Sequence, residues 1–480
     1  MSPALLLAVP VLGAFVLPSL HRASPFASRV AGPLILVVQV ALVAALWQQA
    51  VVHGPLVIEL GGLPAPMGIA WQADQLGLLW CGALALLALV LWPREGHDPN
   101  RAATLTLLLV GAGSGLALSA DLFNLFVLYE LTALASFGLV VSQGTGAQAA
   151  ATLRFLLLGA TGSALALLGI ALIYAATGTL NLAQLAQVTP GAMSDPLVLT
   201  AFALLLAGLG VKAELFPLNT WVPEVYGAAS PRVAGLLAGA VSKLALLVVL
   251  RLLTTIFADT GAAMVLLGVA AVTVLAGELA AYRAQDLRRM LAYSSIGQLG
   301  LMALAFSVSN PTGIAAGLAL GLHHLLVKPA LFVMIADWPR RRPQTRGLAA
   351  GAPWSAAAFV LLALSLVGVP PLPGFWAKLV LLQALLGTGG GPYAAAAALV
   401  LVITVVEAGY LIPLARQLYS GEPAVRVRAR IGRGVPLILA LLLAVVLIGP
   451  VAQRLDQVAS SVPGPAAALP RLSASEPGQP

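Results

Sequence analysis

The sequence predicts an all-α polytopic membrane protein with about 14 transmembrane helices. Of its 480 residues, 60% are hydrophobic and only 9% are charged, whereas soluble chains have about 45–50% apolar and about 25% charged residues. The mean hydropathy of +0.99 also belongs to the membrane class. Because one spanning helix needs about 20 apolar residues, the chain has room for roughly a dozen or more crossings.

The same composition excludes several other classes of function. The single cysteine, Cys81, excludes a disulfide framework and a cysteine metal site. The sequence has no long polar stretch for a catalytic domain, and no phosphate-binding glycine loop, metal-spaced cluster or catalytic triad. We therefore predict no cofactor and no metal site. The net charge of +8 would suggest nucleic acid in a soluble protein, but its placement between apolar segments indicates a lipid bilayer and no nucleic acid.

Fourteen apolar segments are predicted to be helices. They lie at 3–20, 29–52, 74–92, 102–118, 122–142, 152–176, 198–217, 233–256, 261–282, 290–307, 312–337, 355–386, 394–416 and 434–453. The first is short and apolar like a signal peptide, but no basic segment precedes it. We therefore interpret it as a helix of the mature protein.

Arginine and lysine occupy different parts of this pattern. Of the 25 basic residues, 21 are arginines, most of them in the short polar breaks, whereas the four lysines all lie inside apolar stretches. If the first loop is cytoplasmic, the alternation of helices puts 18 arginines on the cytoplasmic side and three (Arg251, Arg454 and Arg471) outside. This asymmetry predicts that both termini lie outside.

Two segments interrupt the helical pattern. Residues 53–73 alternate in polarity and contain Gly-Gly and proline turns, which indicates a short external hairpin. The tail after Leu455 is rich in Ala, Pro and Ser, which predicts a loosely ordered segment. We divide the chain into three N-terminal helices with the hairpin (1–101), a first repeat of helices four to eight (102–257), a second repeat of helices nine to thirteen (258–418), and a final helix with the tail (419–480).

Prolines support this division because they interrupt predicted helices seven and twelve. Pro217 and Pro223 break helix seven, and the segment 368–374 breaks helix twelve. Each break is close to a lysine, Lys212 in the first case and Lys378 in the second, and another charged residue follows one span later. Matching broken helices in two halves are typical of an internal transporter repeat.

The four lysines are the first candidate functional residues: Lys212, Lys243, Lys328 and Lys378. A lysine at the middle of the bilayer costs roughly 2.5–3.5 kcal/mol on insertion scales, so four would cost on the order of 10 kcal/mol, comparable with the stability of a whole domain. Alternatively, each lysine could snorkel from a helix end to the lipid headgroups. That alternative suits Lys212, near a proline break, but not Lys243, which is about ten residues inside its span.

Two carboxylates are candidates on the acidic side. Glu130 lies in an apolar segment, where an unpaired carboxylate would simply become protonated. A lysine on another helix would keep it ionised, and the two groups would then titrate together, as a proton relay requires. Glu407 is a second candidate, although it could instead face a neighbouring protein. Glu214 and Glu278 are not selected, because Glu214 is two residues from Lys212 and so lies on another helix face.

A histidine pair completes the candidates. His324 and Lys328 are four residues apart and therefore share one face of a helix. A lone buried histidine is usually a hydrogen-bonded core residue, but a histidine pair one turn before an intramembrane lysine indicates a proton path. The helical phase favours His324 over His323. The pair could bind haem in principle, which we do not favour because no redox cofactor has evident ligands in the sequence.

Five sequence blocks give the chain a resemblance to a known family. The blocks are ELGGLPAPMGIAWQADQL at 59–76, DLFNLFVLYE at 121–130, VKAELFPLNTWVPEVY at 211–226, DLRRMLAYSSIGQLG at 286–300 and GVPPLPGFWAKLVLLQA at 368–384. From about residue 50 to 420, the chain resembles the proton-translocating membrane subunits shared by respiratory complex I, membrane-bound hydrogenases and Mrp-type cation/proton antiporters. The first two blocks are most similar to the D-type subunit of Mrp-type Na+/H+ antiporters.

The resemblance implies roles for several residues and an environment for the chain. It pairs Glu130 with Lys212, makes Lys243 a connecting lysine, continues the path through His324 and Lys328, and places Lys378 in a second channel. It also implies an inverted repeat, partner membrane subunits, a bacterial inner membrane and Na+ as the exchanged cation. The sequence departs from the family pattern at Leu320, where many relatives have a second histidine, at Pro329, where alanine is usual, and at Glu214, where relatives are apolar.

We therefore predict a proton-conducting subunit of a multisubunit cation/proton antiporter, which is not itself an enzyme. Protons would enter near Lys212 and Glu130 and leave near Lys378 and Glu407. One alternative is the proton-pumping membrane subunit of a redox complex, such as a complex I-like NADH dehydrogenase or a membrane-bound hydrogenase. Another is an inactive structural subunit, but a scaffold would gain stability by losing its buried lysines.

Overall fold

The computed structural model of the protein describes residues 1–93, 98–192, 194–258, 260–421 and 434–462. Within these ranges, ten helices are long and apolar enough to cross a membrane, and a bent pair of helices near the C-terminus adds up to one more. Three shorter apolar helices accompany them. The predicted class, an all-α polytopic membrane protein, is therefore confirmed, with one small two-stranded sheet in addition.

Six helices form the N-terminal part of the protein. They are α1 (Leu5–Ala23), α2 (Pro25–His53), α3 (Gln75–Val90), α4 (Pro99–Leu118), α5 (Leu122–Val140) and α6 (Gly146–Thr177). The last five of these helices begin with a side chain that accepts a hydrogen bond from a backbone N–H of the first turn, and the capping residues are Ser24, Asp74, Asp98, Asp121 and Thr145. These caps fix where each apolar segment starts to be helical.

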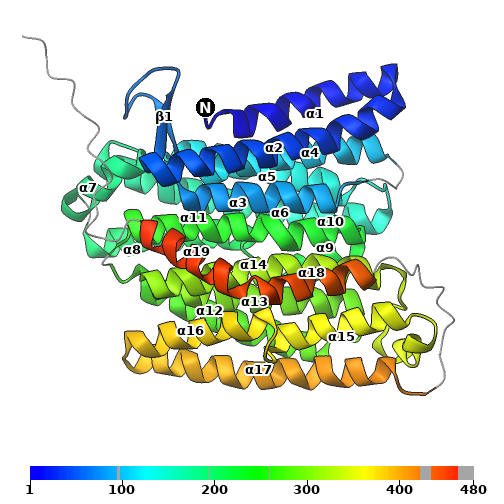
Figure 1. Ribbon diagram of the computed structural model, residues 1–480. Helices are drawn as coiled ribbons and strands as arrows, with labels where there is room; N and C mark the ends of the chain where they lie inside the picture. Colours follow the sequence, from blue (N-terminus) through cyan, green and yellow to red (C-terminus); the bar gives the residue numbers. More distant parts are fainter. Residues whose placement is uncertain (94–97, 193, 259, 422–433, 463–480) are drawn as a thin grey trace, which may run out of the picture.

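The segment in which the sequence indicates a hairpin contains two antiparallel strands. Strand β1 (Leu56–Leu60) pairs with β2 (Ile69–Ala73), so that Leu56 lies opposite Ala73. Figure 1 shows this hairpin beyond the end of α2, next to the N-terminus of the chain.

Helix α7 (Leu182–Ala192) follows α6 and precedes the first broken helix. The parts of the broken helix are α8 (Asp195–Lys212) and α9 (Val222–Ala228). Helix α8 ends at Lys212, and Pro223 lies in the first turn of α9, where its missing N–H leaves no backbone bond unmade. The next span consists of α10 (Pro231–Leu236), η1 (Leu237–Val241) and α11 (Ser242–Thr255). Segment η1 is a π-helix, which the sequence did not indicate; such turns are frequent at functional sites.

The next part of the chain contains further helices and a second break. It contains α12 (Ala262–Arg283), α13 (Leu287–Ser307), α14 (Pro311–Met334), the short 3-10 turns η2 (Ile335–Asp337), η3 (Arg342–Thr345) and η4 (Leu348–Ala350), and then α15 (Pro353–Val367), α16 (Pro373–Thr388) and α17 (Gly391–Leu418). Gly368 ends α15 in the left-handed region (φ 90), which glycine adopts readily. Pro373 then starts α16, so the predicted break at 368–374 separates two helices.

One backbone motif occurs in both halves. Asp121 caps α5 by accepting from the N–H groups of the second and third residues after it, and Asp286 caps α13 in the same way. Each aspartate also forms an isolated antiparallel bridge with a residue that precedes the next broken helix, Asp121 with Asn181 and Asp286 with Arg341. The flanking backbone bonds have the same pattern in both bridges, since Leu122 N donates to the carbonyl of residue 180 and Leu287 N to that of residue 340.

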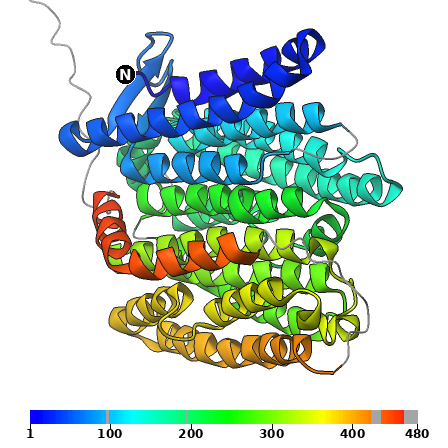
Figure 2. The same cartoon turned by 45° about the vertical axis from the view of Figure 1, so that its right-hand side comes forward.

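The C-terminal region differs from its prediction. The sequence predicts one helix at 434–453 and a loosely ordered tail after Leu455, and both expectations are wrong in part. The chain bends by 65° between α18 (Gly434–Val446) and α19 (Ile448–Ser461), as Figure 2 shows. A glycine and a proline at 449–450 lie in the first turn of α19, a position that proline tolerates.

Helix α19 continues past Leu455 because this residue, Val458 and Ala459 are buried, and the helix packs against α14 and α3. The remaining tail, 463–480, lies outside the described residues. So do six of the arginines used to predict the orientation of the chain, namely Arg94, Arg426, Arg428, Arg430, Arg433 and Arg471.

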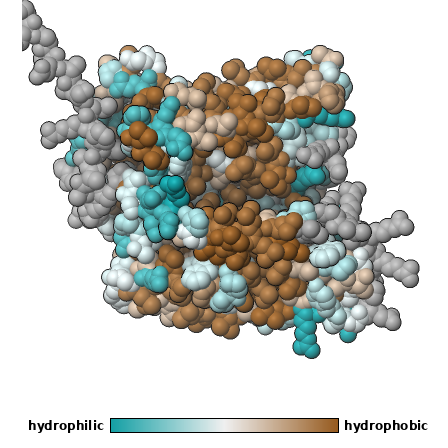
Figure 3. Space-filling view, viewed as in Figure 1, coloured by the Kyte–Doolittle hydropathy of each residue, from teal (hydrophilic) through white to brown (hydrophobic). Residues whose placement is uncertain are grey.

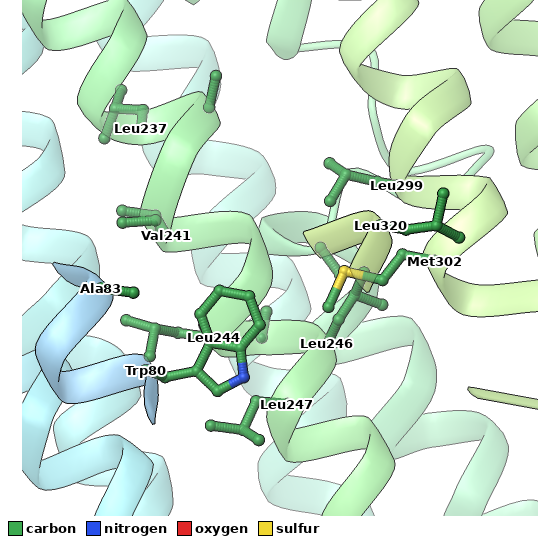
Figure 4. Close-up of a cluster of buried hydrophobic side chains, with 14 of the residues drawn as sticks. Trp80, Ala83, Leu237, Val241, Leu244, Leu246, Leu247, Leu299, Met302 and Leu320 are labelled. Atoms are coloured by element: carbon green, nitrogen blue, oxygen red, sulfur yellow. The ribbon is translucent and has the colours of Figure 1, made fainter. Parts of the chain in front are cut away.

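The helices lie roughly parallel to one another and follow the order of the sequence across the molecule, while α18 and α19 return over its middle (Figures 1 and 2). On the face shown in Figure 3, hydrophobic residues gather along the middle of the helices and hydrophilic residues toward their two ends. The span from α10 to α11 is the most enclosed helix, since its apolar window is entirely buried. In Figure 4, Trp80 of α3 lies beside Leu244 and Leu247 of α11, and Leu246 lies toward Met302 of α13. The candidate residues on α11 are therefore at the centre of the protein.

Candidate functional site

The four candidate lysines are all inside the protein. Their exposed fractions are 1% for Lys212, 0% for Lys243 and Lys328, and 6% for Lys378. The snorkelling alternative is therefore wrong for each of them, because a snorkelling lysine keeps its ammonium in the headgroup region. A buried ammonium is stable only where hydrogen bonds and opposite charges compensate it.

Lys212 and Glu130 form the first ion pair, with 3.1 Å between Nζ and Oε1. Lys212 also donates to the carbonyl of Tyr129 at 2.9 Å, and Nζ lies 3.1 Å from the centre of the Tyr129 ring. The Ser163 hydroxyl donates to the same Glu130 oxygen at 2.5 Å. The pair thus joins α5, α6 and α8, and α6 and α8 approach closely because a Cβ at Gly208 would lie only 2.5 Å from the Gly162 carbonyl.

Glu130 is more exposed than its partner. Its side chain is 34% exposed in this chain, and it shares a face of α5 with Phe123, Val127 and Leu134, which are also exposed. This face of α5 (Phe123, Val127, Glu130 and Leu134) is apolar except for the one carboxylate. If this face were in contact with lipid, the carboxylate would be placed there at a high cost in free energy.

Lys243 and His324 form the central contact. Lys243 Nζ lies 2.5 Å from His324 Nδ1, and Lys243 also contacts the Ala238 carbonyl and, at 3.4 Å, the Ser242 hydroxyl. Ala238 belongs to the π-helical η1. The approach of η1 to α14 depends on small residues, since a Cβ at Gly239 would lie 2.9 Å from Pro329 Cγ.

Lys328, one turn after His324 on α14, is the least well bonded of the lysines. Its Nζ makes one long hydrogen bond, 3.4 Å, to the carbonyl of Leu291 on α13. Its charge interacts electrostatically with the carboxylates of Glu214, Glu278 and Glu407. It therefore lies between the two halves of the site without belonging to either ion pair.

Lys378 and Glu407 form the second ion pair, which is buried, with 2.6 Å between Nζ and Oε2. Lys378 also donates to the carbonyl of Val367 at 3.1 Å. Val367 is the last residue of α15, where carbonyls have no partner within the helix, so the helix break supplies this acceptor. The other oxygen of Glu407 accepts from Gln298 of α13 at 2.9 Å. Glu407 thus faces the interior and not a neighbouring protein.

The structure also places polar residues here that sequence reasoning did not select. Tyr410 donates to Glu278 at 2.9 Å, and Tyr226 donates to Glu214. Both carboxylates are buried, and both carried the signal that selected Glu130, an acid inside an apolar segment. Their partners come from other elements, which the sequence does not indicate.

The two adjacent histidines face different helices. His324 contacts Lys243, as described, whereas His323 Nε2 lies 3.0 Å from the hydroxyl of Ser365 on α15. A Cβ at Gly374, just beyond the break before α16, would lie 2.9 Å from the His323 ring. Of the two, His324, which the sequence analysis preferred on helical phase, is the histidine in contact with a candidate lysine.

A fifth buried cation joins the four lysines. Arg251 lies within α11, inside the helix predicted at 233–256, and is buried. Its Nη2 lies 2.7 Å from Asp74 Oδ1 and 2.9 Å from the carbonyl of Ala117. Asp74 also accepts from Gly77 N at 2.7 Å as the cap of α3, so this pair fastens α11 to the start of α3.

Among the described residues, no group of three or more His, Cys, Asp or Glu side chains could hold a metal ion. What the site does contain is a series of proton donors and acceptors through the interior, with one ion pair at each of two broken helices. Intramembrane lysines, carboxylates and histidines in this setting are typical of membrane transporters and proton relays. The fold and the site therefore define a membrane protein of the transporter class.

Comparison with known proteins identifies the family. Residues 119–405 match the family described as NADH:quinone oxidoreductase/Mrp antiporter, transmembrane. The chain is 33% identical over 422 residues, 84% of each chain, to the N-type subunit of the NADH-quinone oxidoreductase of Desulforudis audaxviator. It is also 33% identical over 346 residues, 69% of this chain and 70% of the relative, to the D-type subunit of the Na(+)/H(+) antiporter of Alkalihalophilus pseudofirmus.

Solved structures give the same result. A chain of the archaeal membrane-bound sulfane sulfur reductase complex matches with a TM-score of 0.88 and 31% identity, covering 97% of this chain and 98% of that one. A chain of the Mrp complex from Dietzia sp. matches with a TM-score of 0.86 and 28% identity, covering 96% of both. The protein belongs to the NADH:quinone oxidoreductase/Mrp antiporter family of membrane subunits, which confirms the resemblance found in the five sequence blocks.

Proposed function

We propose that the chain is a proton-conducting subunit of a multisubunit cation/proton antiporter. One observation carries the proposal: two lysine–glutamate pairs, one at each helix break, flank a direct Lys243–His324 contact at the centre of the protein. A scaffold would be more stable with well-packed apolar residues in place of these charges. Paired ionisable groups titrate together, as a proton relay requires.

The proposed path begins at Glu130 and Lys212, passes Lys243, His324 and Lys328, and ends at Lys378 and Glu407. A proton that arrives at one ion pair changes its net charge, and this change alters the proton affinity of the next group. Lys328 is the coupling group in this scheme, because its charge interacts with carboxylates of both halves.

We also propose fourteen crossings with two inverted repeats. Ten long helices, three shorter apolar ones and the bent α18–α19 pair add up to fourteen. The first repeat would span 102–257 and the second 258–418, after an N-terminal region (1–101) and before a final helix (419–480). The repeated Asp121–Asn181 and Asp286–Arg341 bridges support this division, because each joins the second helix of a repeat to the segment before its broken helix.

The partners in this proposal are other membrane subunits, and the exchanged cation is Na+. A relative of 33% identity belongs to an Na(+)/H(+) antiporter, and a structural neighbour is part of the Mrp complex. The apolar face of α5 that carries Glu130 supports the proposal of a membrane partner, because such a partner would shield the carboxylate from lipid. By the family resemblance, the chain would lie in a bacterial inner membrane, and by the arginine asymmetry both termini would lie outside.

The second candidate is the proton-pumping membrane subunit of a redox complex, and relatives named as N-type subunits of NADH-quinone oxidoreductase favour it. Everted vesicles of an antiporter-deficient host, carrying this chain with its partners, distinguish the two. Antiport predicts that a preformed pH gradient collapses when Na+ is added without an electron donor, and that Glu130→Gln abolishes the collapse. Proton movement that requires an electron donor would support the redox alternative.

The scaffold alternative has a test of its own. It predicts that neutralising Glu130 and Lys212 together raises the thermal stability of the assembled complex and leaves proton movement unchanged. Our proposal predicts that the double variant assembles but no longer moves protons. Comparison of assembly by gel filtration with gradient collapse in the same vesicles decides between them.

A further inference from the structure

Glu214 is a buried carboxylate that the path proposed above does not use. It lies in the break between α8 and α9, two residues after Lys212, and it is fully buried. Its backbone has φ 61, in the left-handed region that residues other than glycine rarely adopt. A glutamate held in this conformation is an unusual way to connect two helices, since glycine or asparagine would do so with less strain.

Adjacent parts of this break face different groups. Lys212 contacts Glu130 and Tyr129 on α5. The Glu214 carboxylate, in contrast, accepts a hydrogen bond from Tyr226 on α9 and interacts electrostatically with Lys243 on α11 and Lys328 on α14. Two residues of the break, Lys212 and Glu214, therefore face different groups. Lys212 faces Glu130, and Glu214 faces the side of Lys243.

The two oxygens of Glu214 have different surroundings. Oε1 accepts a hydrogen bond from the Tyr226 hydroxyl, whereas Oε2 is buried and has no hydrogen-bond partner among the described residues. A buried carboxylate oxygen without a partner is costly, and a bound proton or a water molecule would remove that cost. Oε2 is therefore an acceptor that is free to receive a proton.

The charges of the neighbouring groups are consistent with this role. Lys243 contacts His324, Ser242 and the Ala238 carbonyl, and in the described part of the chain it has no carboxylate at hydrogen-bond distance. Glu214 is the carboxylate whose charge acts on it. A proton that moves between the two converts an ion pair into a neutral pair or the reverse, so neither state leaves an isolated charge in the interior.

We propose that Glu214 is a further proton-carrying residue, which connects the Glu130–Lys212 pair to Lys243. This inference rests on the proposed function, because it adds a step to the same path. In this step, the Lys212 ammonium gives its proton to Glu214 Oε2, and Glu214 passes that proton on to Lys243, which accepts it as the neutral amine. Tyr226 holds the other oxygen and thereby fixes the direction of the carboxylate.

Glu214→Gln separates this role from a structural one. The glutamine carbonyl can still accept from Tyr226, so the break keeps its hydrogen bond, but the side chain no longer binds a proton. In everted vesicles with the assembled complex, we expect the Na+-dependent collapse of the pH gradient to slow by about a hundredfold, the lower range for loss of a positioned acid–base group. We also expect the dependence of the remaining rate on pH to change, because one titrating group is gone.

Glu214→Asp and Glu214→Asn form a matched pair if the glutamine variant does not assemble. Both residues tolerate the left-handed backbone better than glutamate does, and they differ only in the ability to carry a proton. Faster transport by the aspartate variant than by the asparagine variant supports the proposal. Equal rates for the two would overturn it.

Glu130→Gln in the same vesicles distinguishes failure of this inference from failure of the proposed function. If Glu130→Gln is inactive while Glu214→Gln has the rate and pH dependence of the wild type, Glu214 carries no protons and the rest of the path stands. If both variants transport like the wild type, the proposed path itself is wrong.

Discussion

Lys243 Nζ and His324 Nδ1 lie 2.5 Å apart, and this contact joins α11 to α14 at the centre of the protein. An ammonium only donates, and a neutral imidazole accepts through one of its two nitrogens. At this distance, the Lys243 amine and the His324 imidazole cannot both be protonated and positively charged at the same time. A proton can therefore pass from Lys243 to His324 along one hydrogen bond, and Nε2, which is buried without a partner among the described residues, is left to pass it on.

The Lys378–Glu407 pair should depend on both of its members for stability. Lys378→Met leaves Glu407 buried with Gln298 but without its counter-ion, and loss of one member of a buried pair costs about 3–5 kcal/mol. Replacement of both, Lys378→Met with Glu407→Leu, removes the uncompensated charge, so we expect a smaller loss than for either single variant. The melting temperatures of the purified complexes measure this. Losses that simply add would show that the two side chains do not interact.

The Arg251–Asp74 pair should affect stability and not transport. It joins α11 to the cap of α3, away from the broken helices, so Arg251→Met or Asp74→Asn should destabilise the protein by up to about 3–5 kcal/mol. We expect a lower melting temperature and a lower yield of complex, with an unchanged transport rate per assembled complex. A changed pH dependence of transport in either variant would place this pair on the proton path.

The face of α5 that carries Glu130 should become covered when the complex assembles. In the isolated chain, a lipid-soluble carbodiimide should modify Glu130, which is partly exposed, and not Glu407, which is buried. In the assembled complex we expect Glu130 to be protected. Peptide mass spectrometry locates the modification, and Glu130→Gln serves as the control. Equal modification of Glu130 before and after assembly would mean that no partner covers this face.

The close contact between η1 and α14 should be sensitive to one methyl group. A Cβ at Gly239 would lie 2.4 Å from Leu87 Cδ2 and 2.9 Å from Pro329 Cγ. Gly239→Ala should therefore separate these elements, at a cost of about 1–3 kcal/mol, and slow transport by lengthening the Lys243–His324 contact. Gly268→Ala is the matched control, because no atom lies within 4 Å of the added group. Equal transport by the two variants would argue that this contact does not limit proton movement.

Much of the framework could be predicted from single residues in the sequence. Lysines inside apolar stretches are costly wherever they lie, so Lys212 and Lys378 were identifiable without knowledge of their partners. Prolines act locally on the backbone, which is why the breaks at 217–223 and 368–374 were also predictable.

The rest depends on contacts between distant segments. Arg251 and Asp74 are 177 residues apart, so the sequence does not show that they form an ion pair. Glu278 contacts Tyr410 across 132 residues, so the sequence does not show the hydrogen-bond partner of Glu278. The π-helix before Lys243 packs against Pro329 of α14, and no local pattern in the sequence indicates it.

In the proposed path, protons cross the protein through the Lys243–His324 contact. The most direct test is the Na+-driven proton flux of the assembled complex in sealed vesicles, measured for His324→Ala and for His323→Ala. His323 contacts Ser365 and takes no part in the Lys243–His324 contact. The His323→Ala variant therefore serves as a control for the loss of a buried imidazole. We predict that His324→Ala lowers the flux by about a hundredfold and that His323→Ala lowers it much less. A wild-type flux in an assembled His324→Ala complex would contradict the proposed path.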